Sequence, residues 1–523
     1  MATKAGRSLA TGPGRAEVAL PRPPSGLVAV AGAVAAAALL PVAYLVVRAG
    51  GGGWSAIADT LFLDRTARLL VRSLGLAAAV SLASAAIGIA LAWLTVRCDL
   101  PGRRIWRVVA ALPLAVPSYV AAFAFVSNVP DVSGFVPTFA VLTLLSYPYV
   151  FLPVAAALER VDPALEEAAR SLGDSAATAF RRVTLRQVRP AAATGSLLVC
   201  LYVLSDFGAV SILRFDSFTR VIYQSYRSSF DRRPAAILGC LLLVFTLGIL
   251  VAEARTRGRA RYHAGGRGAR RPPLVALGRW RWVAMALPAA VALLALVVPL
   301  ATIVRWLAES VQASADLDRV GRAAGGSVLA SVLGAVVTAA AAIPVALRAA
   351  LARRRLAGVI ERSSFVGHAL PGIVVALSLV FFTVRFMNPL YQRLPVLIFA
   401  YVVLFLPLAV SSVYASALQA PPSLDEVARS LGRRPRDVFR TVTAPLIAPG
   451  VAAGTALVFL TCLKELPATL LLGPTGYETL ATRVWSTTQA GAYGDAALPA
   501  LLLVAVGVLP TWALTRRRGT SLT

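Results

Sequence analysis

The segment EAARSLG at residues 167–173 recurs 259 positions later as EVARSLG at residues 426–432. Each copy lies in a basic segment between two long apolar stretches. Further identities follow at the same offset: Phe180 with Phe439, Arg181 with Arg440, Pro190 with Pro449 and Gly195 with Gly454. The chain is therefore a tandem duplication. Two matching segments on one face of a membrane could each bind one copy of a soluble partner.

The composition indicates a membrane protein. Of the 523 residues 58% are hydrophobic and only 15% are charged, with a mean hydropathy of +0.74. The apolar runs are about 20 residues long, which is the length that crosses a hydrocarbon core about 30 Å thick. The net charge of +28 lies mainly between these runs. No soluble stretch is long enough to carry a basic nucleic-acid-binding face, so we expect no nucleic-acid partner.

We predict an all-α membrane protein with about twelve transmembrane helices in two parallel six-helix repeats. The predicted spans are about 27–47, 69–96, 106–128, 135–158, 191–213, 235–253, 282–306, 326–351, 363–385, 394–418, 446–473 and 496–515. The predicted organisation is a leader at 1–26, a first repeat at 27–253, an Arg-rich linker at 254–281, a second repeat at 282–515 and a tail at 516–523.

The placement of basic residues predicts the orientation. Most of the 52 Lys and Arg residues lie in segments on one side of the predicted spans, which assigns that side and both termini to the cytoplasm. Six spans separate the two repeated segments, so both lie on the same face, as parallel repeats require. The Arg-rich linker, from Arg255 to Arg281, is expected to contact membrane lipids.

Each repeated segment carries signals for a short helix followed by a turn. Asp162 and Pro163 fit the N-cap and first position of a helix. In the second copy, residues 423–426 fit a capping box. Gly173 and Gly432 then permit a turn or a close backbone approach that a side chain would obstruct.

This pattern resembles the cytoplasmic signature of permease subunits in binding-protein-dependent ABC importers, in which Glu-Ala-Ala is followed by three residues and Gly. The resemblance implies a type I-like permease fold. It also implies that the loops are coupling helices that dock onto two copies of an ABC ATPase. The matching residues are Glu167, Ala168, Ala169, Gly173, Glu426, Ala428 and Gly432. The departures are Val427 for alanine, Arg186 for proline and Ala444 for leucine, which affect mainly the downstream part of the signature.

The chain has no motif for hydrolysing ATP itself. A P-loop needs a Gly-Lys-[Ser/Thr] sequence, and the two lysines, Lys4 and Lys464, follow Thr3 and Leu463. We therefore expect no cofactor in this chain, with ATP and Mg on a partner subunit. An ion-driven secondary transporter also fits twelve spans in two parallel halves. A membrane-embedded enzyme fits less well, because the spans contain no catalytic constellation.

Three ionisable residues inside predicted spans are candidates for the substrate path: Asp206, Lys464 and Glu465. Asp206 and Glu465 are equivalent in the two repeats and could line a cation path together. The alternative is structural, with Lys464 and Glu465 paired with each other or with neighbours. The two histidines, His263 and His368, are isolated, so no metal-binding residue is assigned.

Two further segments narrow the resemblance. The first half of ferric-iron importer permeases is similar to LSDFGAV at 204–210 and FTRVIY at 218–223 of this chain. The second half is similar to KELPATLLLGP at 464–474. That resemblance implies a bacterial inner-membrane protein that imports Fe(III) delivered by a periplasmic or lipid-anchored binding protein. Fused thiamine permeases share much of this pattern, so thiamine or another small solute remains an alternative substrate.

Overall fold

The computed structural model describes residues 25–129, 131–228, 231–259, 274–310, 317–351, 370–419, 424, 427–428 and 430–520. Across these ranges every regular element is a helix, apart from one isolated bridge between Cys98 and Val275. The predicted all-α class is therefore confirmed. The leader up to residue 24 and residues 260–273 of the linker lie outside the described ranges, and the predicted domain boundaries stay predictions.

Each half is built from several long helices joined by short ones. The first half contains α1 (Ser25–Gly50), α2 (Gly53–Leu61), α3 (Asp64–Arg97), α4 (Arg103–Val109), α5 (Ser118–Val126), α6 (Phe135–Ser146), α7 (Pro148–Leu158), α8 (Pro163–Ser171), α9 (Ala176–Ala179), α10 (Leu185–Ser205), α11 (Gly208–Ile212), α12 (Phe218–Ser228) and α13 (Arg233–Arg259). The second contains α14 (Arg281–Ala292), α15 (Val298–Glu309), α16 (Leu317–Leu351), α18 (Gly372–Phe386), α19 (Leu394–Gln419), α21 (Pro435–Val438), α22 (Ala444–Lys464), α23 (Pro467–Leu472), α24 (Leu480–Gln489) and α25 (Tyr493–Thr520).

Nine helices within the described ranges are long and apolar enough to cross a membrane. A further pair, Arg103–Ala115 and Ser118–Val126, is bent by 90°, and two shorter apolar helices cover Gly372–Phe386 and Tyr493–Val508. The multi-pass architecture is confirmed, whereas the count of twelve spans stays a prediction. The third predicted span, 106–128, is not one continuous helix. Pro117 has no N–H to continue the hydrogen-bond ladder, and the chain turns there.

Equivalent helices build the core of each half. In the first half α3, α7 and α10 pack against one another, and in the second half α16, α19 and α22 do the same. Helices near the start of each half also contact the other half. α1 packs on α16 and α18, while α15 packs on α5. One polar contact accompanies each of these pairings: Ser378 donates to the carbonyl of Pro41, and Asn128 donates to the Thr302 hydroxyl.

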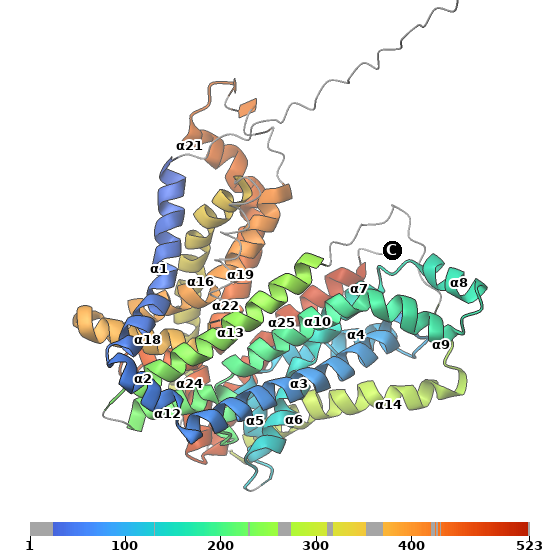
Figure 1. The fold of residues 1–523 in the computed structure, drawn as a ribbon, viewed down its shortest axis with the longest axis horizontal. Helices are drawn as coiled ribbons and strands as arrows, with labels where there is room; N and C mark the ends of the chain where they lie inside the picture. Colours follow the sequence, from blue (N-terminus) through green and yellow to red (C-terminus); the bar gives the residue numbers. More distant parts are fainter. Residues whose placement is uncertain are drawn as a thin grey trace, which may run out of the picture.

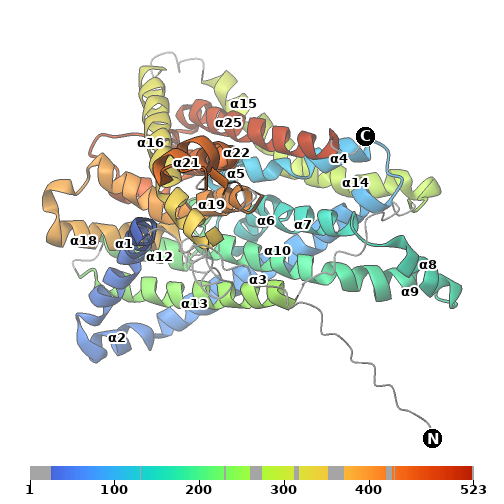
Figure 2. The same ribbon diagram turned by 90° about the horizontal axis from the view of Figure 1, so that it is seen from above.

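The two bundles diverge at one end and meet at the other. Figure 1 shows them spreading apart toward α8 in the first half and α21 in the second. In Figure 2, seen from above, α1 is viewed nearly end-on, whereas α3, α10 and α13 lie along the plane of the view. The two bundles converge where α12 and α24 lie. We call this junction the seam. There α11 and α5 of the first half contact α24 of the second half, and α12 contacts α18. The fold therefore places the two repeated loops on the separated ends of two joined bundles.

Candidate functional site

The first repeated loop folds as a helix followed by a turn, as predicted. The Asp162 side chain accepts a hydrogen bond of 3.0 Å from the Ala164 N–H, so it caps α8 as expected from the sequence. The helix ends at Ser171, and Gly173 follows with a φ of +97°, which side-chain-bearing residues rarely adopt. A bond of 3.1 Å from the Asp174 N–H to the Ala169 carbonyl closes the turn.

The second loop has the same turn. Gly432 has a φ of +76°, and the Arg433 N–H donates to the Ala428 carbonyl at 3.2 Å, which is the repeat equivalent of the bond made by Asp174. Ser423 and Glu426, the first and last residues of the predicted capping box, lie outside the described residues. Among the described residues, none lies within 4 Å of where a Cβ would be at either glycine. The glycines therefore serve the turn and not a close approach within the chain.

Two leucines in each loop are exposed at equivalent positions. Leu172 is 89% exposed and Leu431 76%, while Leu165 is 51% exposed and Leu424 44%. Exposed apolar side chains that recur on a short polar helix are typical of a surface that a partner covers. We did not assign these leucines from the sequence, although the repetition of Leu172 inside the signature was a usable signal. Among the assigned residues, Glu167 and Ala168 are exposed, and Ala169 and Ala428 are partly exposed.

The predicted spans 191–213 and 446–473 are both interrupted at an acidic residue. α10 ends at Ser205 and α11 begins at Gly208, with Asp206 in an extended conformation between them. α22 ends at Lys464, and Glu465 takes the same conformation before α23. Treating each region as one continuous helix was therefore wrong. A broken helix inside a membrane protein needs other groups to satisfy the freed backbone.

The two acidic side chains supply part of that need. One Asp206 carboxylate oxygen accepts from the N–H of Ala209 at 2.9 Å, and one Glu465 oxygen accepts from the N–H of Ala468 at 3.0 Å. Each carboxylate thus caps the short helix after its break. The backbone carbonyls are also bound: Thr219 donates to Asp206 at 2.6 Å, and Thr469 donates to Glu465 at 2.9 Å.

Lys464 lies at the boundary between the halves. Its ammonium group donates to the Leu114 carbonyl at 3.4 Å, at the bend between α4 and α5. The Tyr119 hydroxyl donates to the Lys464 carbonyl, also at 3.4 Å. The Lys464 side chain therefore bonds a backbone carbonyl of the opposite half, and it also lies next to Gly507 on α25. The assignment of Asp206, Lys464 and Glu465 to a substrate path stays a prediction.

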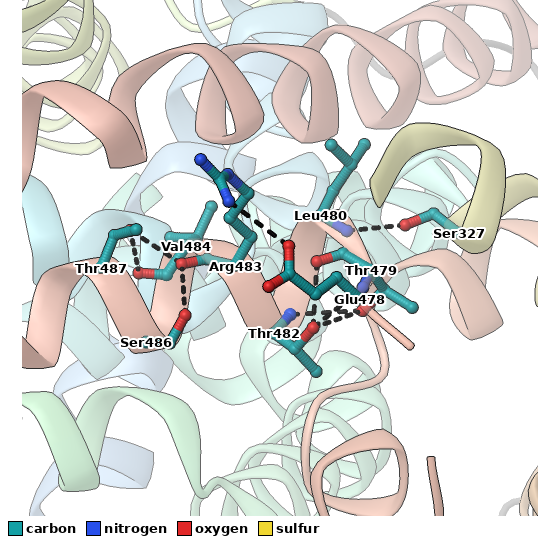
Figure 3. A network of polar contacts seen from close by, with 9 residues as sticks. All are labelled: Ser327, Glu478, Thr479, Leu480, Thr482, Arg483, Val484, Ser486 and Thr487. Carbon is teal, nitrogen blue, oxygen red and sulfur yellow. Dashed lines mark hydrogen bonds and ion pairs between the residues drawn. The ribbon is translucent and has the colours of Figure 1, made fainter. Parts of the chain in front are cut away.

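The segments after each break are anchored by a serine from the long helix beside them. The Ser327 hydroxyl on α16 accepts from the Leu480 N–H at 2.7 Å, and Ser73 on α3 accepts from the Phe218 N–H at 3.1 Å. Figure 3 shows the Ser327 contact next to the ion pair between Glu478 and Arg483, which is 3.3 Å long. These contacts fix α12 and α24 where the two halves meet.

Three aromatic rings close the seam beside Asp206. The ring centroid of Phe207 lies 5.0 Å from that of Tyr223 and 6.2 Å from that of Trp485, and Tyr223 and Trp485 are 6.0 Å apart. Tyr223 belongs to α12 of the first half and Trp485 to α24 of the second. The described residues contain no group of three His, Cys, Asp or Glu side chains that could hold a metal ion.

Comparison with known proteins identifies the family. Residues 84–256 and 342–516 each match the family described as binding-protein-dependent transport system inner membrane component. The chain belongs to that family. The two matches fall one in each half, as the duplication requires, and the predicted resemblance is confirmed. This permease is thus the membrane subunit of an ABC transporter. In this family a separate subunit hydrolyses ATP, and a substrate-binding protein is a partner.

The relatives differ in the solutes that their names state. The Fe(3+)-transport system permease protein FbpB 2 of Haemophilus influenzae is 36% identical over 482 residues, which cover 91% of this chain and 95% of that protein. The sulfate transport system permease protein CysT of Salmonella typhimurium is 29% identical over 188 residues, 33% of this chain and 68% of that protein. The probable ABC transporter permease y4fN of Sinorhizobium fredii is 28% identical over 65% of this chain and 64% of its own length.

Proposed function

We propose that this permease imports Fe(III) across the bacterial inner membrane. The observation that carries the proposal is the 36% identity to FbpB 2 over 91% of the chain, through both halves and both repeated loops. The sulfate permease CysT of Salmonella typhimurium matches only 33% of the chain, at 29% identity. A binding protein, periplasmic or lipid-anchored, delivers the ion to the end of the molecule that carries α12 and α24.

Two ATPase subunits drive the cycle, one at each repeated loop. Each binds the exposed surface of one coupling helix, with Leu172 or Leu431 as an apolar contact. Closure of the ATPase dimer moves both helices together, and the two bundles rock about the seam. ATP shifts the conformational equilibrium only through its different affinity for the two states. Both chain termini lie in the cytoplasm, and ATP and Mg bind the partner subunits alone.

Asp206 and Glu465 line the path for the ion. Carboxylate oxygens are hard ligands of the type that Fe(III) prefers. Each carboxylate here has one oxygen in a capping bond to a backbone N–H. Because a carboxylate oxygen can accept more than one bond, each group keeps acceptor capacity for a weak and transient contact with the ion. Tight binding is left to the binding protein, because a tight site in the path would slow release.

The deciding experiment is substrate-dependent ATP turnover in liposomes that contain the permease, the ATPase and the binding protein. Fe(III) is expected to stimulate hydrolysis and to accumulate inside, whereas thiamine and sulfate do neither. Stimulation by thiamine or sulfate, and not by Fe(III), refutes the substrate. Labelling an introduced thiol at position 174 in intact cells tests the orientation. Modification by an impermeant reagent from outside would refute a cytoplasmic coupling loop.

A further inference from the structure

The inner end of α3 is joined to the first coupling helix by a buried ion pair. Arg97 is the last residue of α3, and its side chain is 3% exposed. Its guanidinium binds one carboxylate oxygen of Glu166 on α8, whose side chain is 17% exposed. The Thr184 hydroxyl, in the π-helical turn Phe180–Thr184 before α10, donates to the other oxygen. Glu166 therefore connects α8 to both α3 and α10.

This contact differs from the other ion pairs at the same end of the first half. Arg107 and Glu159 are 38% and 41% exposed, and Arg182 and Asp174 are 72% and 24% exposed. Water screens such pairs, and they contribute little to stability. Arg97 is buried, and its Nε and Nη1 have no hydrogen-bond partner among the residues that the structure describes. Removing the charge of Glu166 would leave a buried cation without compensation, which is strongly unfavourable.

The helices joined by Glu166 both reach the seam between the halves. α3 runs for 34 residues, and Ser73 near its other end anchors the start of α12. α10 runs from the Thr184 turn to the break at Asp206. A displacement of α8 that Glu166 transmits to α3 and α10 would therefore reach the seam at the start of α12 and at the break at Asp206. Apart from the bonds of Glu166, α8 packs on the turn Phe180–Thr184 and on α9.

We propose that Glu166 is the positioning residue that transmits movement of the first coupling helix to α3 and α10. It adjoins Glu167, which belongs to the family signature and is exposed. The two neighbouring acidic residues thus have different roles. Glu167 lies on the side of α8 that faces the partner, and Glu166 lies on the side that faces the membrane helices. This inference rests on the proposed function, because it assumes that the ATPase acts on α8.

The test uses the full complex of permease, ATPase and binding protein in liposomes. Glu166→Gln removes the charge that Arg97 needs but keeps an oxygen that accepts from Thr184. The ATPase should still co-purify in the normal ratio and hydrolyse ATP, while solute imported per ATP falls about fivefold or more, the lower range of coupling effects between sites. The exchange of Arg97→Glu with Glu166→Arg should restore a large part of the lost coupling.

The matched control is Glu159→Gln, which breaks an exposed ion pair at the same end and should leave coupling unchanged. Normal import per ATP by Glu166→Gln would overturn the inference, and so would a correctly assembled charge exchange that recovers nothing. If Glu166→Gln does not insert, spin labels at positions 82 and 171 of the otherwise native sequence decide the matter. Their separation should stay constant when ATP binds, and a change would show that α8 moves independently of α3.

Failure of the underlying function gives a different result. In that case the native complex itself shows no ATP-driven import of any solute, and the variants have nothing to uncouple.

Discussion

The exposed leucines of the coupling loops give the most direct prediction about partner binding. Leu172 and Leu431 follow the two helical segments at equivalent positions and are 89% and 76% exposed. If each is covered by an ATPase subunit, then Leu172→Ala and Leu431→Ala should weaken binding without changing the fold of the permease. Both side chains point away from the chain's own core, so neither substitution leaves a cavity.

The size of the effect follows from the area available for burial. Truncation to alanine removes about three carbon groups, each contributing about 0.8 kcal/mol when fully buried. Scaled by the exposed fractions, the loss is about 2 kcal/mol at each loop. Because 1.4 kcal/mol corresponds to a factor of about ten in affinity, the ATPase should bind each altered loop about 20- to 40-fold more weakly. The two loops are far apart, so their effects should add.

The assay is titration of labelled ATPase onto the permease in lipid nanodiscs. Leu82→Ala is the matched control, since Leu82 is 73% exposed but lies within α3, in the membrane-spanning part. That variant should bind the ATPase with native affinity. Native affinity in the double variant of the loops, or equal losses in the loop variants and the control, would refute the assignment of these leucines to the interface.

Three further predictions follow from backbone geometry and charge. Gly173→Ala should lose about 1–2 kcal/mol of turn stability because residue 173 has a positive φ, and Gly173→Asn should lose less. The measurement is the affinity of each variant for the ATPase. Equal affinities of the two variants would contradict the turn argument. Gly195→Ala should lower the melting temperature in detergent more than Gly454→Ala. A Cβ at position 195 would lie 2.7 Å from the Tyr149 carbonyl oxygen, whereas a Cβ at position 454 would lie 3.2 Å from its nearest atom. The reverse order of melting temperatures would contradict the packing argument. Asp206→Asn keeps the helix cap but removes the charge, so import should slow while thermal stability stays near native; unchanged import would remove Asp206 from the path.

The duplicated loops could be predicted in detail because their signals are local. The N-cap of Asp162, the helix after it and the turn at Gly173 depend on neighbouring residues, and the structure has each of them. The same is true of the all-α class, which follows from the length and composition of the apolar runs. Periodicity and capping signals each depend on a single segment of the chain. They are therefore sufficient to predict the helix, its N-cap, the turn and the all-α class.

The breaks at Asp206 and Glu465 could not be placed with the same tools. Both lie in apolar stretches of ordinary length, and an acid inside such a stretch is equally typical of a path residue and of a cap. What decides their geometry is the short helix on the other side of the break and the threonine that binds the freed carbonyl. The packing of α1 and α15 on the opposite half is likewise a tertiary feature that no local pattern indicates.

The ion pair between Arg97 and Glu166 could not be predicted from the sequence for a related reason. The two residues are 69 positions apart, and each lies in a segment where basic or acidic residues are expected for topology alone. Among the described arginines at that end, Arg97 is distinguished by its burial.

The repeat is interrupted at one position that bears on how the halves move. Lys464 stands where the first half has Ser205, so its ammonium group has no symmetric counterpart. The chain turns by 90° between Ala115 and Ser118, which takes the Leu114 carbonyl out of a continuous helix. Lys464 provides a donor for that carbonyl from the other half. A backbone acceptor inside the membrane needs a partner, so this contact ties the second half to the bend of the first. If the bundles rock about the seam as proposed, the movement either preserves this bond or exchanges it for another, because the Leu114 carbonyl needs a donor in both conformations.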